Sequence, residues 1–121
     1  MSIKKVLVVD DSPTERFYLV DILRKHGFDT ETAESGDEGI AKAKAILPDL
    51  ILMDVVMPGI NGFQVTRMLS RDDATKAIPV IICTSKGQET DRVWGMRQGA
   101  VAYLVKPIAA DDLLEKIRNF D

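Results

Sequence analysis

The chain has 121 residues, of which 45% are hydrophobic and 29% are charged. This length is enough for one domain and too short for two, and a domain of this size needs no disulfide or metal ion to fold. The 19 acidic and 16 basic residues give a formal net charge of −3. Mild acidity disfavours nucleic acid as the main partner, because duplex-binding domains carry a basic face. The single cysteine, Cys83, cannot form an internal disulfide, which fits a reducing compartment.

The N-terminal sequence MSIKKVLVVDD predicts neither a secretory signal nor a membrane anchor. Its apolar run has four residues, and acidic residues follow it directly. The longest stretch without a charge, Val55–Thr66, has 12 residues and is too short to span a bilayer. We therefore expect a cytoplasmic domain that does not insert into a membrane.

The first quarter of the chain predicts a strand followed by a helix. Val6–Val9 is a short apolar run of the kind that forms a strand buried on both faces of a parallel sheet. Ser12–Glu15 (SPTE) then has the pattern of a capping box with proline at the first helical position. The helix that follows places three apolar residues on one stripe and ends at Arg24–Gly27; the stripe is Phe17, Val20 and Leu23.

The middle of the chain repeats this order twice. Phe28–Ala33 alternates between apolar and polar residues, which predicts a strand at an edge of the sheet. A second helix, stopped by Pro48, is marked by Ile40, Ala43 and Leu47. Leu50–Met53 predicts the third strand, and a helix from about Gly62 to Ser70 follows, with Val65 and Leu69 on its apolar side.

The last part of the chain predicts two more pairs. The strand Val80–Cys83 precedes a helix that carries Val93 and Met96 and stops at Gly99. The strand Val101–Val105 precedes a final helix whose apolar residues are Leu113, Leu114 and Ile117, with Asp111 and Asp112 near its N-terminal end. Strict alternation of strand and helix, five times, predicts an α/β fold with a parallel sheet and helices on both faces.

The chemistry of such a fold lies beyond the carboxyl ends of its strands. Asp10 and Asp11 follow the first strand, Asp54 follows the third, Thr84 the fourth and Lys106 the fifth. Three clustered carboxylates should attract a hard dication, and Mg²⁺ fits best because it shares its ligands with phosphate oxygens. One carboxylate can then act as a nucleophile toward phosphorus, while the lysine and the hydroxyl bind phosphate oxygens. The residues thus favour phosphoryl transfer to a carboxylate.

Four motifs at these strand ends resemble the receiver domain of bacterial two-component response regulators. They are Val8–Ser12 (VVDDS), Met53–Gly59 (MDVVMPG), Cys83–Ser85 (CTS) and Tyr103–Pro107 (YLVKP). The segment Gln88–Pro107 further resembles the PilH/PilG-type regulators of type IV pilus twitching motility. The resemblance covers essentially the whole chain and implies that residues 1–121 form a single receiver domain without an output domain. The implied fold is a flavodoxin-like (βα)5 sandwich with strand order 2-1-3-4-5.

The resemblance also implies a role for each site residue. Asp54 resembles the phosphoacceptor, and Asp10, Asp11 and the backbone carbonyl of Val56 resemble its partners in holding Mg²⁺. Lys106 resembles the phosphate-binding lysine, in cis linkage to Pro107. Thr84 resembles the switch hydroxyl, and Tyr103 the aromatic residue that turns inward with it. An apolar Val56, together with Lys86, leads us to expect slow self-dephosphorylation.

The expected function is a stand-alone, monomeric switch that accepts a phosphoryl group from the phosphohistidine of a sensor kinase or phosphotransfer domain. It changes the face made by the fourth helix, fifth strand and fifth helix, and so controls a partner protein or serves as a phosphate sink for another regulator. It is not an enzyme beyond its own phosphorylation and dephosphorylation.

Two alternatives of other classes stay open from the residues alone. A small aspartyl-phosphate phosphatase also uses an aspartate nucleophile with Mg²⁺, but it places two aspartates two residues apart after the first strand. A flavin mononucleotide carrier needs a phosphate-binding loop at that place, where Asp10 and Asp11 repel phosphate. Three further residues have structural interpretations: His26 interacts with the dipole at a helix C-terminus, Cys83 fills the core, and Trp94 packs on its helix or contacts a partner.

Overall fold

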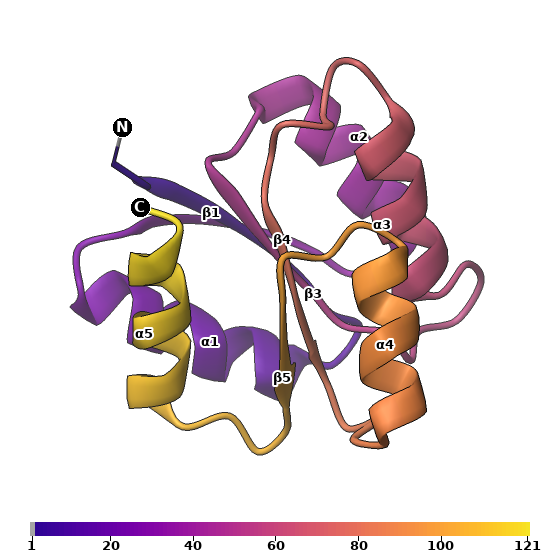
Figure 1. Cartoon of the computed structure of the whole chain (residues 1–121). Helices are drawn as coiled ribbons and strands as arrows, with labels where there is room; N and C mark the ends of the chain where they lie inside the picture. The colour runs from indigo at the N-terminus through magenta and orange to yellow at the C-terminus, as the bar shows by residue number, and fades with distance from the viewer. Residues whose placement is uncertain (1) are drawn as a thin grey trace.

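The structure, a computed structural model, describes residues 2–121. Five strands and five helices alternate along the chain (Figure 1). The strands are β1 (Lys5–Val9), β2 (Asp29–Ala33), β3 (Leu50–Met53), β4 (Val80–Thr84) and β5 (Ala102–Val105). The helices are α1 (Pro13–Lys25), α2 (Gly36–Ile46), α3 (Gly62–Arg71), α4 (Glu89–Arg97) and α5 (Ala110–Asn119).

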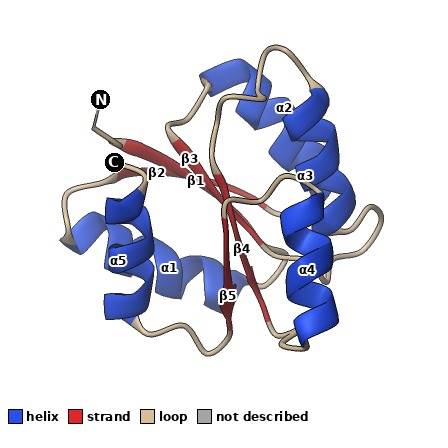
Figure 2. Cartoon of the chain, in the orientation of Figure 1, coloured by secondary structure: helices blue, strands red, loops and turns tan. Residues whose placement is uncertain are grey.

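All strands pair in parallel, in the order β2-β1-β3-β4-β5, which confirms the predicted fold class and topology. Helices α1 and α5 cover one face of the sheet, and α2, α3 and α4 cover the other (Figure 2). No helix within residues 2–121 combines the length and the apolar character needed to cross a membrane.

Strand residues alternate between the two sides of the sheet, as the period of two requires. In β1, Val6 and Val8 join the core on the α1/α5 side, whereas Leu7 and Val9 join the core on the α2/α3 side. In β3, Leu52 joins the core on the α1/α5 side and Met53 joins the core on the α2/α3 side. Both cores are therefore built from the same short strands, which explains why these strands read as continuous apolar runs.

Three helix stripes differ from the sequence prediction. Phe17 is 75% exposed, because the buried stripe of α1 is centred on Leu19 and Leu23 and a residue two positions before Leu19 lies on the opposite side. Leu47 lies outside α2 in a left-handed conformation and is exposed. In α4, Val93 and Met96 are exposed, since only Gly95 of this helix is buried.

The capping box predicted at Ser12 is half formed. The Ser12 hydroxyl accepts a hydrogen bond from the Glu15 backbone N–H at 3.3 Å, but the Ser12 N–H donates to the Asp10 carboxylate at 2.9 Å. The Glu15 carboxylate instead lies 3.8 Å from the ammonium of Lys106. A reciprocal capping box forms at the start of α3, between Asn61 and Gln64. The Ser12 N–H and the Glu15 carboxylate, which would pair in a complete capping box, therefore contact Asp10 and Lys106 instead.

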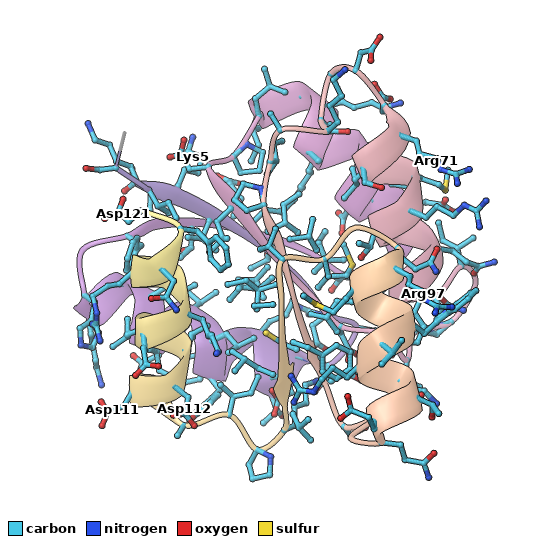
Figure 3. All side chains as sticks on the ribbon, viewed as in Figure 1. Lys5, Arg71, Arg97, Asp111, Asp112 and Asp121 are labelled. Carbon is cyan, nitrogen blue, oxygen red and sulfur yellow. The ribbon has the colours of Figure 1, made fainter. Side chains whose placement is uncertain are left out.

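Charged side chains outside this region project from the outer helix surfaces (Figure 3). Arg71 and Arg97 are the last residues of α3 and α4, and Asp111 and Asp112 lie in the first turn of α5. These placements oppose the partial charges of the helix ends. The buried charges gather instead at the carboxyl ends of the strands.

Candidate functional site

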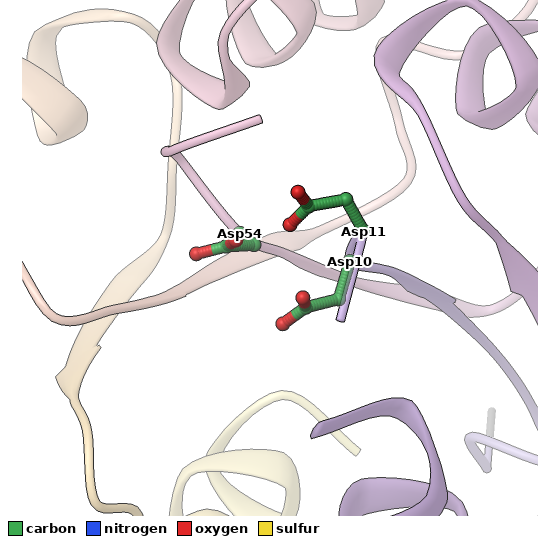
Figure 4. A group of neighbouring side chains, drawn as sticks. All are labelled: Asp10, Asp11 and Asp54. Atoms are coloured by element: carbon green, nitrogen blue, oxygen red, sulfur yellow. The ribbon is translucent and has the colours of Figure 1, made fainter. Parts of the chain in front are cut away.

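The carboxyl edge of the sheet brings together three acidic side chains (Figure 4). Asp10 and Asp11 follow β1 and Asp54 follows β3, and one carboxylate oxygen from each lies within 4.8 Å of the others. Asp10 and Asp54 are 1% and 6% exposed, whereas Asp11 is exposed. The site therefore has a buried pair of acids and an acid open to solvent.

The backbone fixes the two buried acids. The Asp54 N–H donates to the Val9 carbonyl at 2.9 Å, which continues the pairing of β1 with β3 by one residue. The Asp10 N–H donates to the Ala33 carbonyl at 3.1 Å and so continues the pairing with β2. Because Asp10 and Asp54 follow their strands by one position, they share the alternation of Val8 and Leu52 and lie toward the α1/α5 side.

Lys106 supplies the positive charge of the site. Its Nζ lies 2.9 Å from Asp10 Oδ2 and 3.4 Å from Asp54 Oδ1. The Lys106 backbone N–H donates to the Thr84 carbonyl at 2.8 Å, which ties the end of β5 to β4. The bond from Lys106 to Pro107 is cis, as predicted. Burial alone lowers the pKa of Lys106, but the hydrogen bond with Asp10 and the charges of Asp54, Asp10 and Glu15 outweigh it and raise the pKa.

The carboxyl group of Asp54 has a raised pKa. Burial, and then the negative charge of Asp10, raise its pKa from an ordinary 3.8 to about 6, although Lys106 acts in the opposite direction. A carboxylate with this pKa is ionised at neutral pH and is also a stronger base than an exposed aspartate. The buried acid with a perturbed pKa in a polar cluster has the character of a reacting group.

Thr84 and Tyr103 lie on the other side of the sheet from the acids. Thr84 is fully buried, and its Oγ1 accepts a hydrogen bond from the Lys86 N–H at 3.3 Å. Tyr103 is 3% exposed, and its hydroxyl donates to the Lys86 carbonyl at 2.6 Å. The backbone of Lys86 therefore connects the two residues that the sequence assigned to switching.

Val56 and Lys86 flank the site, and within the described residues 2–121 neither makes a hydrogen bond or ion pair with its carboxylates. The Val56 side chain is 59% exposed, and within residues 2–121 its carbonyl accepts no hydrogen bond. The Lys86 ammonium lies 3.9 Å from an Asp91 oxygen. Both residues line an open groove of about 360 Å³, together with Val55, Met57, Gly59, Asn61 and Phe63.

The sequence prediction missed residues that support the site from α1 and α3. Arg16 donates to the Asp10 carbonyl at 2.7 Å and to the Glu34 carboxylate at 3.0 Å, and Glu15 faces Lys106. Gly62 lets α3 begin directly over the Asp54 backbone, since a Cβ there would lie 1.9 Å from the Asp54 carbonyl oxygen. The glycine at the first position of a helix was the available signal for this close approach.

The donor set fits a small divalent cation. Asp10, Asp11 and Asp54 offer carboxylate oxygens, and the Val56 carbonyl is free to offer another. The site has no histidine or thiol ligand: His26 contacts the Ile22 carbonyl, and Cys83 lies in the core, where burial raises its thiol pKa. An all-oxygen set of this charge is suited to Mg²⁺.

Comparison with known proteins agrees with this geometry. The sequence pattern of the response regulator receiver domain matches residues 6–118. The chain belongs to the receiver family of response regulators. This receiver is 56% identical over 113 residues to the protein PilH of Pseudomonas aeruginosa, and the match covers 93% of each chain.

The receiver is also similar to longer regulators and to solved structures. It is 35% identical to the DNA-binding response regulator MtrA of Mycolicibacterium smegmatis, but it spans 49% of that protein. The chemotaxis protein CheY4 of Vibrio cholerae superposes with a TM-score of 0.92 at 32% identity, over 99% of this chain and 100% of that one. A response regulator of Chloroflexus aurantiacus superposes with a TM-score of 0.93 at 30% identity, over 98% of both chains.

Proposed function

We propose that the receiver is a phosphorylation-controlled switch in which Asp54 accepts a phosphoryl group from the phosphohistidine of a sensor kinase or phosphotransfer domain. The observation that carries this proposal is the position of the Lys106 ammonium, which contacts both Asp10 and Asp54 at the buried end of the sheet. The receiver family and the site chemistry both support it.

The reaction is a displacement at phosphorus. An Oδ atom of Asp54 forms a bond to phosphorus while the phosphorus–nitrogen bond of the phosphohistidine breaks. The donor imidazole leaves as a neutral group when its other ring nitrogen carries a proton. Asp54 must be ionised to attack, and a pKa of about 6 leaves most of it ionised at pH 7.

The surrounding groups neutralise charge and hold position. Lys106 offsets the negative charge that accumulates when a phosphoryl group meets three carboxylates. Asp10, Asp11, Asp54 and the Val56 carbonyl would hold Mg²⁺, which when bound neutralises phosphate charge. Burial of Asp10 and Asp54 excludes water from their side and strengthens each of these interactions.

The output is a change of surface, not the turnover of a substrate. Phosphorylation draws Thr84 toward the phosphoryl group, and the Lys86 backbone transmits this shift to Tyr103. The face formed by α4, β5 and α5 then changes its affinity for a partner protein. The similarity to PilH over 93% of each chain supports a role in type IV pilus or chemotaxis-like signalling. A role as a phosphate sink uses the same chemistry without a downstream partner.

The test is incubation with acetyl phosphate and Mg²⁺, followed by intact-mass and peptide analysis. We expect one phosphate per chain, on Asp54. Asp54→Asn should abolish labelling, while Asp73→Asn, which changes an acid on the surface, should leave it intact. Labelling of the Asp54→Asn variant at the same stoichiometry would overturn the assignment, and multiple turnover of small phosphate monoesters would favour the phosphatase alternative.

We expect the phosphorylated form to last for minutes or longer without a phosphatase. The exposed side chain of Val56 has no polar group to orient an attacking water, and the Lys86 ammonium is drawn toward Asp91 on α4. A half-life of seconds or less would contradict this expectation.

A further inference from the structure

The ring of Tyr103 lies in a closely fitted position between β5 and α4. It belongs to a small apolar cluster with Val55, Phe63, Ile82 and Ala100. Its hydroxyl reaches the Lys86 carbonyl at the edge of this cluster. Burial of the ring raises the pKa of Tyr103 to about 12, which agrees with a phenol held away from water.

Gly95 provides the space for this ring. It is the one buried residue of α4, and a Cβ at this position would lie 3.1 Å from both Cδ2 and Cε2 of Tyr103 and 2.9 Å from the Ile82 Cδ1 methyl. The methyl ends a flexible side chain and can move, but the ring is held by its hydroxyl. Glycine inside a helix costs about 1 kcal/mol relative to alanine, so its presence here indicates a need for space.

Arg92 covers the ring from outside. It precedes Gly95 by three residues and therefore lies near it on the helix surface. Its guanidinium carbon is 5.5 Å from the centre of the Tyr103 ring, a distance typical of a cation–π contact, and its N–H points to the Tyr103 carbonyl at 3.5 Å. One turn of α4 thus meets the Tyr103 ring at two places. Gly95 lies beside Cδ2 and Cε2 of the ring, and Arg92 lies over its face.

We infer that Gly95 and Arg92 are positioning residues that hold Tyr103 inward and thereby set how strongly the Asp54 site is coupled to the α4–β5 surface. The claim about coupling to Asp54 rests on the proposed function, whereas the claim about the position of Tyr103 does not. Coupling is reciprocal: if phosphorylation of Asp54 favours the inward ring, a change that disfavours the inward ring must disfavour phosphorylation. The Lys86 backbone, bonded to both Thr84 and Tyr103, is the path that joins the two sites.

The position of the Tyr103 ring can be measured in the unphosphorylated protein. The chain has two tyrosines, Tyr18 and Tyr103, so incorporation of 3-fluorotyrosine gives two fluorine signals, which a Tyr18→Phe variant assigns. A soluble gadolinium chelate broadens signals of exposed rings. We expect the Tyr103 signal to be protected and the signal of Tyr18, which is 41% exposed, to be broadened.

Gly95→Ala should expose the ring, so that the broadening of Tyr103 approaches that of Tyr18. Arg92→Ala should increase the broadening of the Tyr103 signal less than Gly95→Ala does. Because Arg92 is exposed, this variant should fold even if Gly95→Ala does not, so the inference can still be tested. Gly39→Ala is the matched control, because it makes the same change in α2, where the nearest atoms are methyls of Val9. A Tyr103 signal as protected in both α4 variants as in the control would overturn the positioning role.

Phosphorylation by acetyl phosphate tests the coupling. We expect the fraction of chains phosphorylated on Asp54 at steady state to fall severalfold in Gly95→Ala and less in Arg92→Ala, with no change in Gly39→Ala. Displacement of the ring with unchanged labelling would overturn the coupling while the positioning role stands. If the wild-type chain is not labelled at Asp54, the proposed function fails, and the fluorine signals still decide the positioning role.

Discussion

The ammonium of Lys106 lies closer to Asp10, at 2.9 Å, than to Asp54, at 3.4 Å. Its short hydrogen bond is therefore made to Asp10 and not to the proposed phosphoacceptor, Asp54. Asp54 keeps a longer contact with the same cation and keeps a raised pKa, because burial and the charge of Asp10 exceed the effect of the lysine. At neutral pH the site therefore keeps Asp54, the proposed phosphoacceptor, ionised without a short hydrogen bond to Lys106.

Asp54 should make the protein less stable at neutral pH than an uncharged side chain would. Between pH 3.8 and about 6 the folded chain binds more protons at Asp54 than the unfolded chain, so stability falls as the pH rises through this window. Asp54→Asn removes this fall. We expect the variant to match the wild type near pH 3.5 and to exceed it by up to about 3 kcal/mol above pH 6.5.

Urea unfolding of both proteins in EDTA at a series of pH values measures this difference. Asp73→Asn serves as the control, since its carboxylate is 95% exposed. A stability difference that stays constant from pH 4 to pH 7 would show that Asp54 has no raised pKa.

Lys106→Met should destabilise the fold by about 3 kcal/mol at pH 7, because it leaves two buried carboxylates without their cation. The loss should shrink at lower pH, as Asp54 takes up a proton, and in Mg²⁺, which replaces the missing charge. Lys76→Met removes a lysine that pairs with Asp73 on the surface and should cost less than about 1 kcal/mol. Equal losses in the two variants, measured by urea unfolding, would contradict a buried role for Lys106.

Residues that follow the strands could be predicted from the sequence, and residues that depend on packing could not. Asp10, Asp54 and Lys106 each come directly after an apolar run, and parallel strands bring such ends to one edge. The alternation of the strands even separates these residues from Tyr103, which lies toward α4. Apolar periodicity was a weaker guide for the helices.

The helices show why. In α4 the exposed Val93 and Met96 follow a plausible apolar spacing, but the helix packs through Gly95, which has no apolar side chain to mark it in a periodic pattern. At Ser12 the local pattern for a capping box was present, yet the Ser12 N–H donates to Asp10, two residues earlier, and the Glu15 carboxylate lies near Lys106 at the end of β5. A local sequence pattern predicts where a helix begins, but the surrounding residues determine which hydrogen bonds its capping groups make.

Mg²⁺ should stabilise the receiver, and the exposed acid of the site should be needed for this effect. Binding to the folded state alone raises the unfolding free energy by RT ln(1 + [Mg²⁺]/Kd). Asp11→Asn should leave stability in EDTA within about 0.5 kcal/mol, because Asp11 is exposed, while it weakens the dependence on Mg²⁺. Thermal unfolding at increasing Mg²⁺, with Asp73→Asn as the control, measures both effects. An unchanged response of Asp11→Asn to Mg²⁺ would place the cation elsewhere.

Gly62→Ala should damage the site through its backbone. A Cβ at this position would lie 1.9 Å from the Asp54 carbonyl oxygen and 2.8 Å from the Val55 Cα, so either α3 or the loop after β3 must move. Backbone atoms cannot rotate away as a side chain can, and we expect a loss of about 3 kcal/mol together with slower labelling of Asp54. Gly39→Ala should change stability by less than about 1 kcal/mol, because the three atoms nearest its new methyl all belong to the Val9 side chain, from 3.0 Å, and alanine favours the helix. Urea unfolding and acetyl phosphate labelling of the two variants give the comparison, and a Gly62→Ala protein as stable and as readily labelled as Gly39→Ala would mean that α3 does not fix the position of Asp54.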